Sequence, residues 1–172
     1  MDRLEVLEKA YADLGGYLLA VCRRYVSDAD TSQDLFQDGF VAAYTHFHQF
    51  SDRGKGSLKA WLTRIMVNTC LQYLRKGDLK KLQSLEECTV DATQCEPPAA
   101  ETVEALSETQ ILEMIAELPI GERTVFNMYV FEDYSQQEIA RALGIKRGAV
   151  AMRYQRARNT LASKIRAYEK QS

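Results

Sequence analysis

Five basic side chains are concentrated in a short stretch near the end of the chain, where few acids lie beside them. They are Lys146, Arg147, Arg153, Arg156 and Arg158. Guanidinium and ammonium groups bind phosphate oxygens, and a bidentate arginine–guanine contact is worth about 1–3 kcal/mol of discrimination. Ala149 and Met152 add apolar surface of the kind that contacts a thymine methyl group. These residue types predict a DNA-binding surface rather than a merely solvated face.

The residues from Tyr134 to Leu161 predict the element that positions these side chains. Ser135 and Glu138 have the spacing of a capping box, and Gly144 suits the left-handed residue that ends a helix. A second helix is predicted from about Arg147 to about Tyr168. Its apolar positions are Val150, Tyr154, Ala157 and Leu161, and its opposite face carries Arg147, Met152, Arg153 and Arg156. A helix, a glycine turn and a second, basic helix predict a helix-turn-helix that enters a major groove.

A second group of residues combines aromatic rings with cations. Its members are Phe50, Arg53, Lys55, Lys59, Trp61 and Arg64. Single-stranded DNA is bound by cations that follow its backbone and by rings on which unstacked bases stack. The simpler alternative for Trp61 is core packing against Ile65. Ser57 is predicted to cap the helix that follows this basic loop.

Helical periodicity covers most of the chain, and no strand is expected. In the first module, helices are predicted over residues 2–26, 31–48 and 58–76, with Asp30 or a neighbour capping the second. The first helix is expected to face the core through Leu4, Leu7, Tyr11, Leu14, Leu18 and Val21. The second module begins with a helix through Ile111 and Ile115, followed by one over 121–131 and the helix-turn-helix. The predicted fold is therefore all-α, with small domains at 1–77 and 105–172 joined by a flexible linker, 78–104.

The charge pattern divides the chain in the same way, although the net charge is only −2. Residues 51–81 carry eight Lys and Arg against two acids, and residues 123–172 carry ten against four. Residues 82–122 carry ten acids and no base. Basic blocks bind phosphates and acidic ones repel them, so the two nucleic-acid surfaces fall on either side of an acidic linker.

Other classes of protein fit the composition less well. The four cysteines (Cys22, Cys70, Cys88, Cys95) lack paired spacing and only His46 and His48 accompany them, so no metal and no cofactor is expected. Cys22 and Cys70 are expected in the core. No apolar run approaches the length of a membrane span, and Tyr17–Cys22 is too short for a signal sequence. The expected location is the cytoplasm, without membrane insertion.

Two separated blocks resemble a known family. Residues 34–40 (Asp-Leu-Phe-Gln-Asp-Gly-Phe) with 58–68 (Leu-Lys-Ala-Trp-Leu-Thr-Arg-Ile-Met-Val-Asn) resemble domain two of bacterial extracytoplasmic-function sigma factors, members of the sigma-70 family. Leu118-Pro119, Glu122-Arg123, residues 134–140 and Gly148 to Leu161 resemble domain four. The helix-turn-helix alone is weakly specific, whereas its combination with the tryptophan block is strong.

The resemblance implies a function for each surface. The helix-turn-helix would read the minus-thirty-five promoter element. The Phe50–Asn68 block would melt the minus-ten element and hold a flipped base in a pocket near Asn68, with Ile65 and Gln72 on the same surface. Asp34, Gln37 and Asp38 would dock on the clamp helices of core RNA polymerase, although acids near a helix start also complement its dipole. An anti-sigma factor would be a further partner.

Two alanines of the recognition helix depart from the family pattern, and the acids of the linker allow two interpretations. Ala149 and Ala151 replace the threonine and lysine common in the family, so promoter preference cannot be copied from relatives. The linker acids are either a soluble tether or a segment that occupies the basic RNA channel of the polymerase. They are Glu86, Glu87, Asp91, Glu96, Glu101 and Glu104.

The leading hypothesis is a transcription initiation factor that binds core RNA polymerase and promoter DNA and performs no catalysis itself. The alternative is a helix-turn-helix regulator that acts without joining polymerase, which leaves the Phe50–Asn68 block without a role. An enzyme acting on nucleic acid would need a carboxylate cluster or a nucleophile–base pair, and neither is evident in the sequence.

Overall fold

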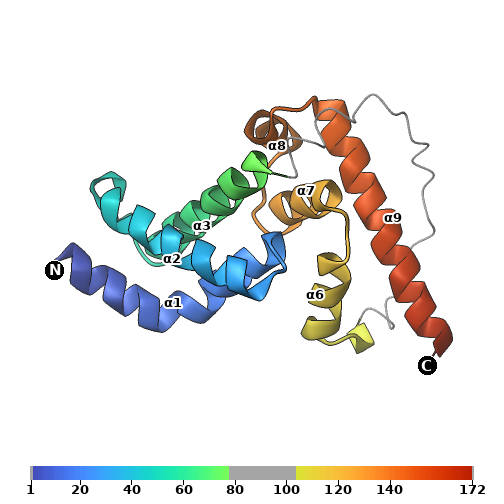
Figure 1. The fold of residues 1–172 in the computed structure, drawn as a ribbon, viewed down its shortest axis with the longest axis horizontal. Helices are drawn as coiled ribbons and strands as arrows, with labels where there is room; N and C mark the ends of the chain where they lie inside the picture. Colours follow the sequence, from blue (N-terminus) through green and yellow to red (C-terminus); the bar gives the residue numbers. More distant parts are fainter. Residues whose placement is uncertain (1, 78–103, 172) are drawn as a thin grey trace. The chain divides into compact units, whose positions relative to one another are not determined.

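The computed structural model describes residues 2–77 and 104–171, and every regular element in these ranges is helical (Figure 1). The all-α prediction is confirmed for this part of the chain. Two compact units are distinguished, Met1–Leu74 and Arg75–Ser172. The predicted flexible linker lies outside the described residues. No helix within the described ranges combines the length and apolar character that crossing a bilayer requires.

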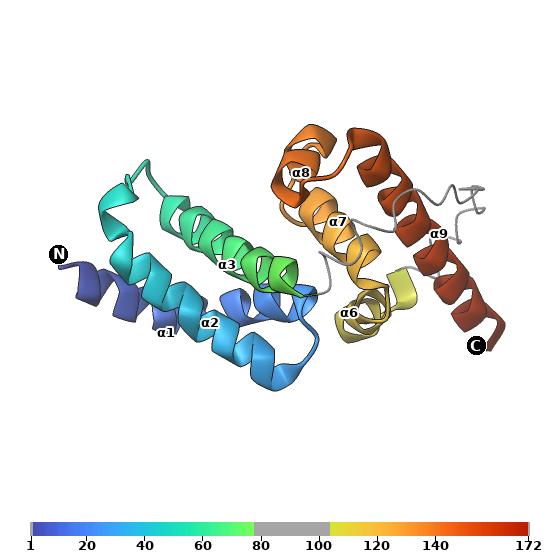
Figure 2. The same ribbon diagram turned by 45° about the horizontal axis from the view of Figure 1, so that its top comes forward.

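The first unit contains α1 (Arg3–Tyr25), α2 (Ala29–Thr45), the short 3-10 helix η1 (Phe47–Gln49) and α3 (Ser57–Lys76). In both views α2 runs back along α1, and α3 returns beside it after the connection drawn in teal (Figure 2). Asp28 caps α2, because its carboxylate accepts a 2.9 Å hydrogen bond from the Thr31 amide. The helix therefore begins two residues earlier than predicted.

The core of the first unit is formed by apolar side chains from all three helices. The fully or nearly fully buried ones are Leu18, Val21, Cys22, Tyr25, Leu35, Phe36, Leu62, Met66, Val67, Cys70 and Leu71. The prediction that Leu4 and Tyr11 face this core is wrong, since they are 49% and 44% exposed. Both lie on the outer side of α1. The Tyr11 ring packs against the rings of Phe36 and Phe40, with centroids 5.4 and 5.1 Å away.

The second unit contains α6 (Glu108–Ala116), α7 (Ile120–Val130), α8 (Gln136–Leu143) and α9 (Arg147–Gln171). Ser107 and Gln110 form a capping box at the start of α6. The long helix α9 packs against α6, α7 and α8 (Figure 1). A cluster of Ile115, Leu118 and Ala157, flanked by Phe126 and Leu161, joins α6 and α7 to α9.

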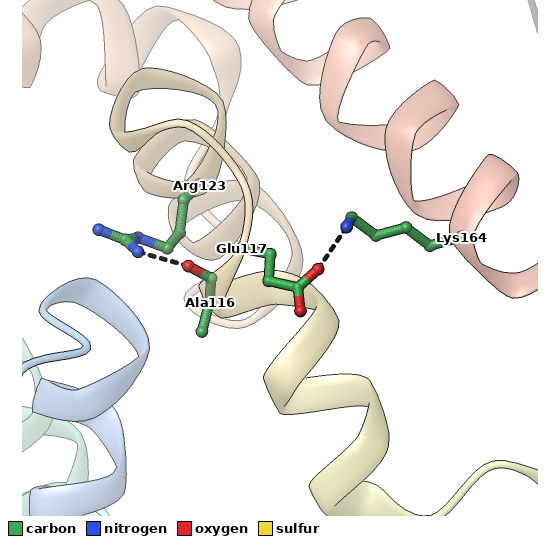
Figure 3. A network of polar contacts seen from close by, with 4 residues as sticks. All are labelled: Ala116, Glu117, Arg123 and Lys164. Carbon is green, nitrogen blue, oxygen red and sulfur yellow. Dashed lines mark hydrogen bonds and ion pairs between the residues drawn. The ribbon is translucent and has the colours of Figure 1, made fainter.

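Polar contacts fasten the turn between α6 and α7 (Figure 3). Arg123 Nη1 donates a 2.9 Å hydrogen bond to the carbonyl oxygen of Ala116, the last residue of α6. On the other side of the turn, Glu117 accepts a hydrogen bond from Lys164 of α9. A cation at the carboxyl end of a helix is favourable, because it meets unpaired carbonyls and the negative end of the dipole. The Leu118-Pro119 and Glu122-Arg123 segment thus has a structural role in holding α6 on α7.

Candidate nucleic-acid interfaces

A pocket of about 420 Å³ opens between the η1–α3 connection and the start of α3. Its lining residues are Gln49, Phe50, Ser51, Arg53, Ser57, Ala60, Trp61 and Arg64. Trp61 is half-buried, and its ring centroid lies 5.3 Å from that of Phe50 and 6.0 Å from that of Phe47. The aromatic cluster therefore holds Trp61 at the pocket wall, whereas the simpler prediction placed it in the core. A wall of rings beside two arginines suits a flat, anionic ligand such as an unstacked nucleotide.

The basic loop at the pocket mouth is held by Asp52. One of its carboxylate oxygens accepts hydrogen bonds from the Gly54 amide at 2.9 Å and the Ser57 hydroxyl at 3.0 Å. These bonds, the Gly54 amide first, lower the pKa of Asp52 below its ordinary value. Gly54 and Gly56 have φ values of 108° and 89°, which other residues rarely adopt.

The prediction that Ser57 caps α3 is wrong. Ser57 is the first residue of α3, and its hydroxyl bonds to Asp52 and to the Arg53 amide in the preceding loop. The Gly56 carbonyl instead accepts the first helical hydrogen bond, from the Ala60 amide at 3.0 Å. Ser57 therefore fastens the loop to the helix start rather than closing the helix itself.

The other predicted residues of this surface lie outside the pocket, some along the Trp61 side of α3 and two, Lys55 and Lys59, elsewhere. Asn68 and Gln72 are exposed one and two turns beyond Arg64, on the same side of α3 as Trp61, and Ile65, which follows Arg64, is half-buried. None of these three lines the pocket, so the pocket is centred on Trp61 rather than on Asn68. Lys59 projects toward α1, where its ammonium lies 4.2 Å from the centroid of the Tyr17 ring. Lys55 is exposed in the loop.

The predicted helix-turn-helix is confirmed in its local geometry. Ser135 and Glu138 form both hydrogen bonds of a capping box at the start of α8. Gly144 ends that helix with φ 67° and ψ 35°, the left-handed conformation expected of glycine at this position. Ile139 and Leu143 of α8 and Val150 of α9 are buried, which fixes the angle between the two helices.

The basic residues of α9 do not share one face. Arg153 is only 9% exposed, which corrects the prediction that it lies on the outer face. Residue 153 follows Val150 by three positions and precedes Ala157 by four, so the apolar spacing itself places it at the inner edge. Arg156 is 29% exposed and lies 3.7 Å from a carboxylate oxygen of Glu122. Arg158 is exposed beside the Tyr154 ring, at 5.9 Å from its centroid.

Two residues on the outer side of α9 were not among the predicted DNA contacts. Gln155 donates a 3.1 Å hydrogen bond from its amide nitrogen to the Asn159 side-chain oxygen. Gln155 and Asn159 follow Met152 by three and seven positions, so the helical spacing places the three side chains on one side of α9. Asn and Gln make bidentate contacts with adenine. The spacing relative to Val150 and Ala157 was the available signal, whereas a search for positive charge overlooks neutral amides.

The predicted docking residues share an outer face of α2. Asp34, Gln37 and Asp38 are exposed, and Val41, one turn further, is the most exposed large apolar side chain described, at 66%. The Gln37 side-chain nitrogen donates a 3.2 Å hydrogen bond to the Tyr11 hydroxyl of α1. An apolar side chain surrounded by polar ones matches the apolar centre and polar rim of protein–protein interfaces.

Two cysteines lie in the core of the first unit. Cys22 and Cys70 are fully buried, as predicted, and a hydrogen bond from the Cys70 thiol lowers the pKa of Cys22. Within residues 2–77 and 104–171, no three His, Cys, Asp or Glu side chains are grouped closely enough to hold a metal ion.

Comparisons with known proteins agree with this division. The family profile for sigma-70 region 2 matches residues 10–79, and that for sigma-70 region 4 matches residues 108–161. The ECF RNA polymerase sigma factor SigM of Mycobacterium tuberculosis H37Rv is 30% identical over 145 residues, which cover 84% of this chain and 68% of that protein. The RNA polymerase sigma-H factor of Pseudomonas aeruginosa is 27% identical over 154 residues, which cover 84% of this chain and 78% of that protein.

Solved structures show a similar fold. CnrH, in complex with the cytosolic domain of CnrY, has a TM-score of 0.50 and 25% identity, covering 95% of this chain and 90% of that one. The sigma factor RpoE of Bartonella quintana, in complex with the anti-sigma factor NepR, has a TM-score of 0.54 and 22% identity, covering 93% and 96%. The sequence matches and these structures favour a sigma factor over the alternative of a regulator that acts without polymerase. The chain belongs to the extracytoplasmic-function sigma factors of the sigma-70 family, which bind core RNA polymerase and direct it to specific promoters to initiate transcription.

Proposed function

We propose that the two units divide promoter recognition, with the first unit opening the minus-ten element and the second reading the minus-thirty-five element. The observation that carries this proposal is the pocket beside Trp61. A flipped base costs a few kcal/mol to unstack, and stacking on an aromatic ring returns about 1–3 kcal/mol. Phe50 and Trp61 supply the rings, and Arg53 and Arg64 supply the cations for the adjacent phosphates.

Single-stranded DNA leaving this pocket is proposed to follow α3 across Ile65, Asn68 and Gln72. Their position on the Trp61 side of the helix supports this path. Lys55, in the exposed loop, is assigned to the backbone. Lys59 is assigned a weaker contribution, since its ammonium already lies against Tyr17.

The duplex contact is assigned to the outer side of α9. Met152, Gln155 and Arg156 are proposed to reach base edges, with Ala149 beside them. Lys146, Arg147 and Arg158 are proposed to bind phosphates, because they are exposed at the start and side of the helix. Arg153 is assigned to the domain interior, where its burial places it.

Docking on core polymerase is assigned to the α2 face that carries Asp34, Gln37, Asp38 and Val41. Exposure of all four side chains supports this role, and the Tyr11 hydroxyl orients the Gln37 amide. Since its partner is RNA polymerase, the chain is proposed to act in the cytoplasm, as a factor without catalytic activity of its own. By analogy with the sigma factor RpoE of Bartonella quintana, which was solved with the anti-sigma factor NepR, a protein partner of the anti-sigma class is proposed to control it.

Run-off transcription with purified core polymerase on genomic promoter fragments tests the proposal. The full chain is expected to start transcripts at specific sites. Trp61→Ala is expected to retain core binding and to lower open-complex formation by roughly 5- to 100-fold, the equivalent of one lost base–ring stack. Tyr73→Ala, which removes an exposed ring of α3 outside the pocket, is the matched control. Equal melting by the Trp61 and Tyr73 variants would contradict the assignment of the pocket.

A further inference from the structure

Arg156 of the recognition helix is paired with a carboxylate from another helix. Its Nη1 lies 3.7 Å from Glu122 Oε1, so a side chain of α7 reaches the outer side of α9. Its Nε is buried without a hydrogen-bond partner, and 29% of the side chain remains exposed. The guanidinium therefore faces a carboxylate of α7, while part of the side chain remains accessible to solvent.

Glu122 is well placed to restrict this arginine. Only 13% of the Glu122 side chain is exposed, and the residue lies in the first turn of α7, whose packing against α9 fixes their separation. A free arginine loses rotamer freedom when it binds, whereas one already held in place loses less. The planar guanidinium also needs a defined orientation to make two parallel hydrogen bonds to guanine.

We propose that Glu122 is a positioning residue, which orients Arg156 so that its free edge reads one base pair of the minus-thirty-five element. The inference rests on the proposed assignment of the outer side of α9 to that element. This positioning role explains why a carboxylate lies beside a DNA-binding surface, where its negative charge repels phosphate. The simpler role of Glu122 is to complement the positive end of the α7 dipole.

The two roles predict different base preferences for Glu122→Gln. If Glu122 only supplies charge, its loss beside DNA raises affinity for every sequence, because repulsion of the phosphates is removed. If Glu122 orients Arg156, its loss lowers discrimination at one base pair by roughly tenfold while binding to other sequences stays equal or rises. The change in base preference is a measurement that a purely structural role would not move.

The experiment uses holoenzyme assembled from the full chain and core polymerase. Binding to a library of duplexes randomised upstream of a fixed minus-ten element is measured by sequencing the bound fraction. Glu117→Gln is the matched control, because it removes the same charge from the same unit but from a residue paired with Lys164. Thermal unfolding of each variant verifies that the domain remains folded.

Arg156→Ala distinguishes the base-reading role of Arg156 from the positioning role of Glu122. The inference predicts that Arg156→Ala and Glu122→Gln flatten preference at the same base pair, and that Glu117→Gln does not. Loss of preference in Arg156→Ala with normal preference in Glu122→Gln would overturn the positioning role alone. Normal preference in Arg156→Ala would overturn both the base-reading assignment and the inference that rests on it.

Discussion

At the scale of single residues, the cations of the recognition helix differ in what their surroundings allow. Arg158 is exposed and free to follow a phosphate, while Arg156 is restrained by Glu122. Arg153 lies between Val150 and Ala157 on the buried edge of α9. A buried guanidinium is tolerated only where its donors are satisfied, so it stabilises the domain through the groups it meets. Basic composition alone therefore overstates the number of residues available to DNA.

A comparison of Arg153→Ala with Arg158→Ala tests this distinction. Loss of the buried Arg153 side chain is expected to lower the free energy of unfolding by about 1–3 kcal/mol, with little change in base preference of the folded fraction. Loss of Arg158 is expected to weaken binding to all sequences and to reduce the salt slope by about one unit, without lowering the melting temperature. Thermal unfolding and salt-dependent DNA binding measure the two effects. A shifted base preference in Arg153→Ala at unchanged stability would contradict its assignment to the interior.

At the scale of elements, the contact between Gly39 of α2 and the Met66 side chain of α3 explains a glycine inside a helix. Gly39 is buried, and a Cβ built on it would lie 2.3 Å from the Met66 sulfur and 2.9 Å from its methyl carbon. Met66 is itself fully buried and its sulfur is 3.9 Å from the Cys22 thiol, so it has little room to move. The intrinsic cost of glycine in a helix, about 1 kcal/mol, is offset by the close contact that it permits.

Substitution of this glycine is predicted to destabilise the first unit despite improved helix propensity. Gly39→Ala is expected to cost about 1–3 kcal/mol of unfolding free energy through overpacking. Gly16→Ala in α1, where a Cβ would meet nothing within 4 Å, is the control and is expected to stabilise by about 1 kcal/mol. Chemical denaturation measures both.

The contact with Met66 can be isolated by a double variant. Gly39→Ala combined with Met66→Ala is expected to be less destabilising than the sum of the single changes by at least about 0.5 kcal/mol, because the shorter side chain makes room for the new methyl group. Strict additivity, or a Gly39→Ala variant as stable as the parent, would show that the contact with Met66 does not require this glycine.

At the scale of the whole molecule, an acidic stretch of sequence separates two binding units. A family match covers each unit, and the proposed domain functions follow from them. Six acids make the predicted linker acidic, so it is repelled by DNA and attracted to basic protein surfaces; they are Glu86, Glu87, Asp91, Glu96, Glu101 and Glu104. The prediction that it occupies a basic polymerase channel follows from charge alone.

Neutralisation of the linker tests that prediction in the intact holoenzyme. Gln at positions 86, 87, 91, 96, 101 and 104 is expected to lower run-off transcription, because the attraction to the basic channel is lost. A linker with the same residues in scrambled order keeps every charge and is expected to retain activity. Unchanged transcription from the six-Gln variant would leave the linker as a plain tether.

The local elements were determined largely by the sequence itself. The capping box of Ser135 and Glu138 and the left-handed Gly144 depend on contacts within a few residues, and the apolar spacing of Ile139 and Val150 marks the inner side of each helix, so local patterns sufficed to predict the helix-turn-helix. The same holds for most helix boundaries, to within about two or three residues. The cap of α2 was expected at Asp30 or a neighbour and is Asp28, whereas Ser57 bonds to the preceding loop because the Asp52 carboxylate lies within reach of its hydroxyl.

Only the tertiary structure decided which side of each helix is used. Lys59 is directed to Tyr17, Trp61 to Phe47 and Phe50, and Arg156 to Glu122, in each case through a partner from another segment of the chain. The same is true of Tyr11, which joins Gln37 at the surface instead of entering the core. Periodicity assigns a residue to a sector of its own helix, but it contains no information about the helix packed opposite. The physical basis of the recognition surfaces is therefore this packing, which places the ring, the cation and the carboxylate within reach of one another.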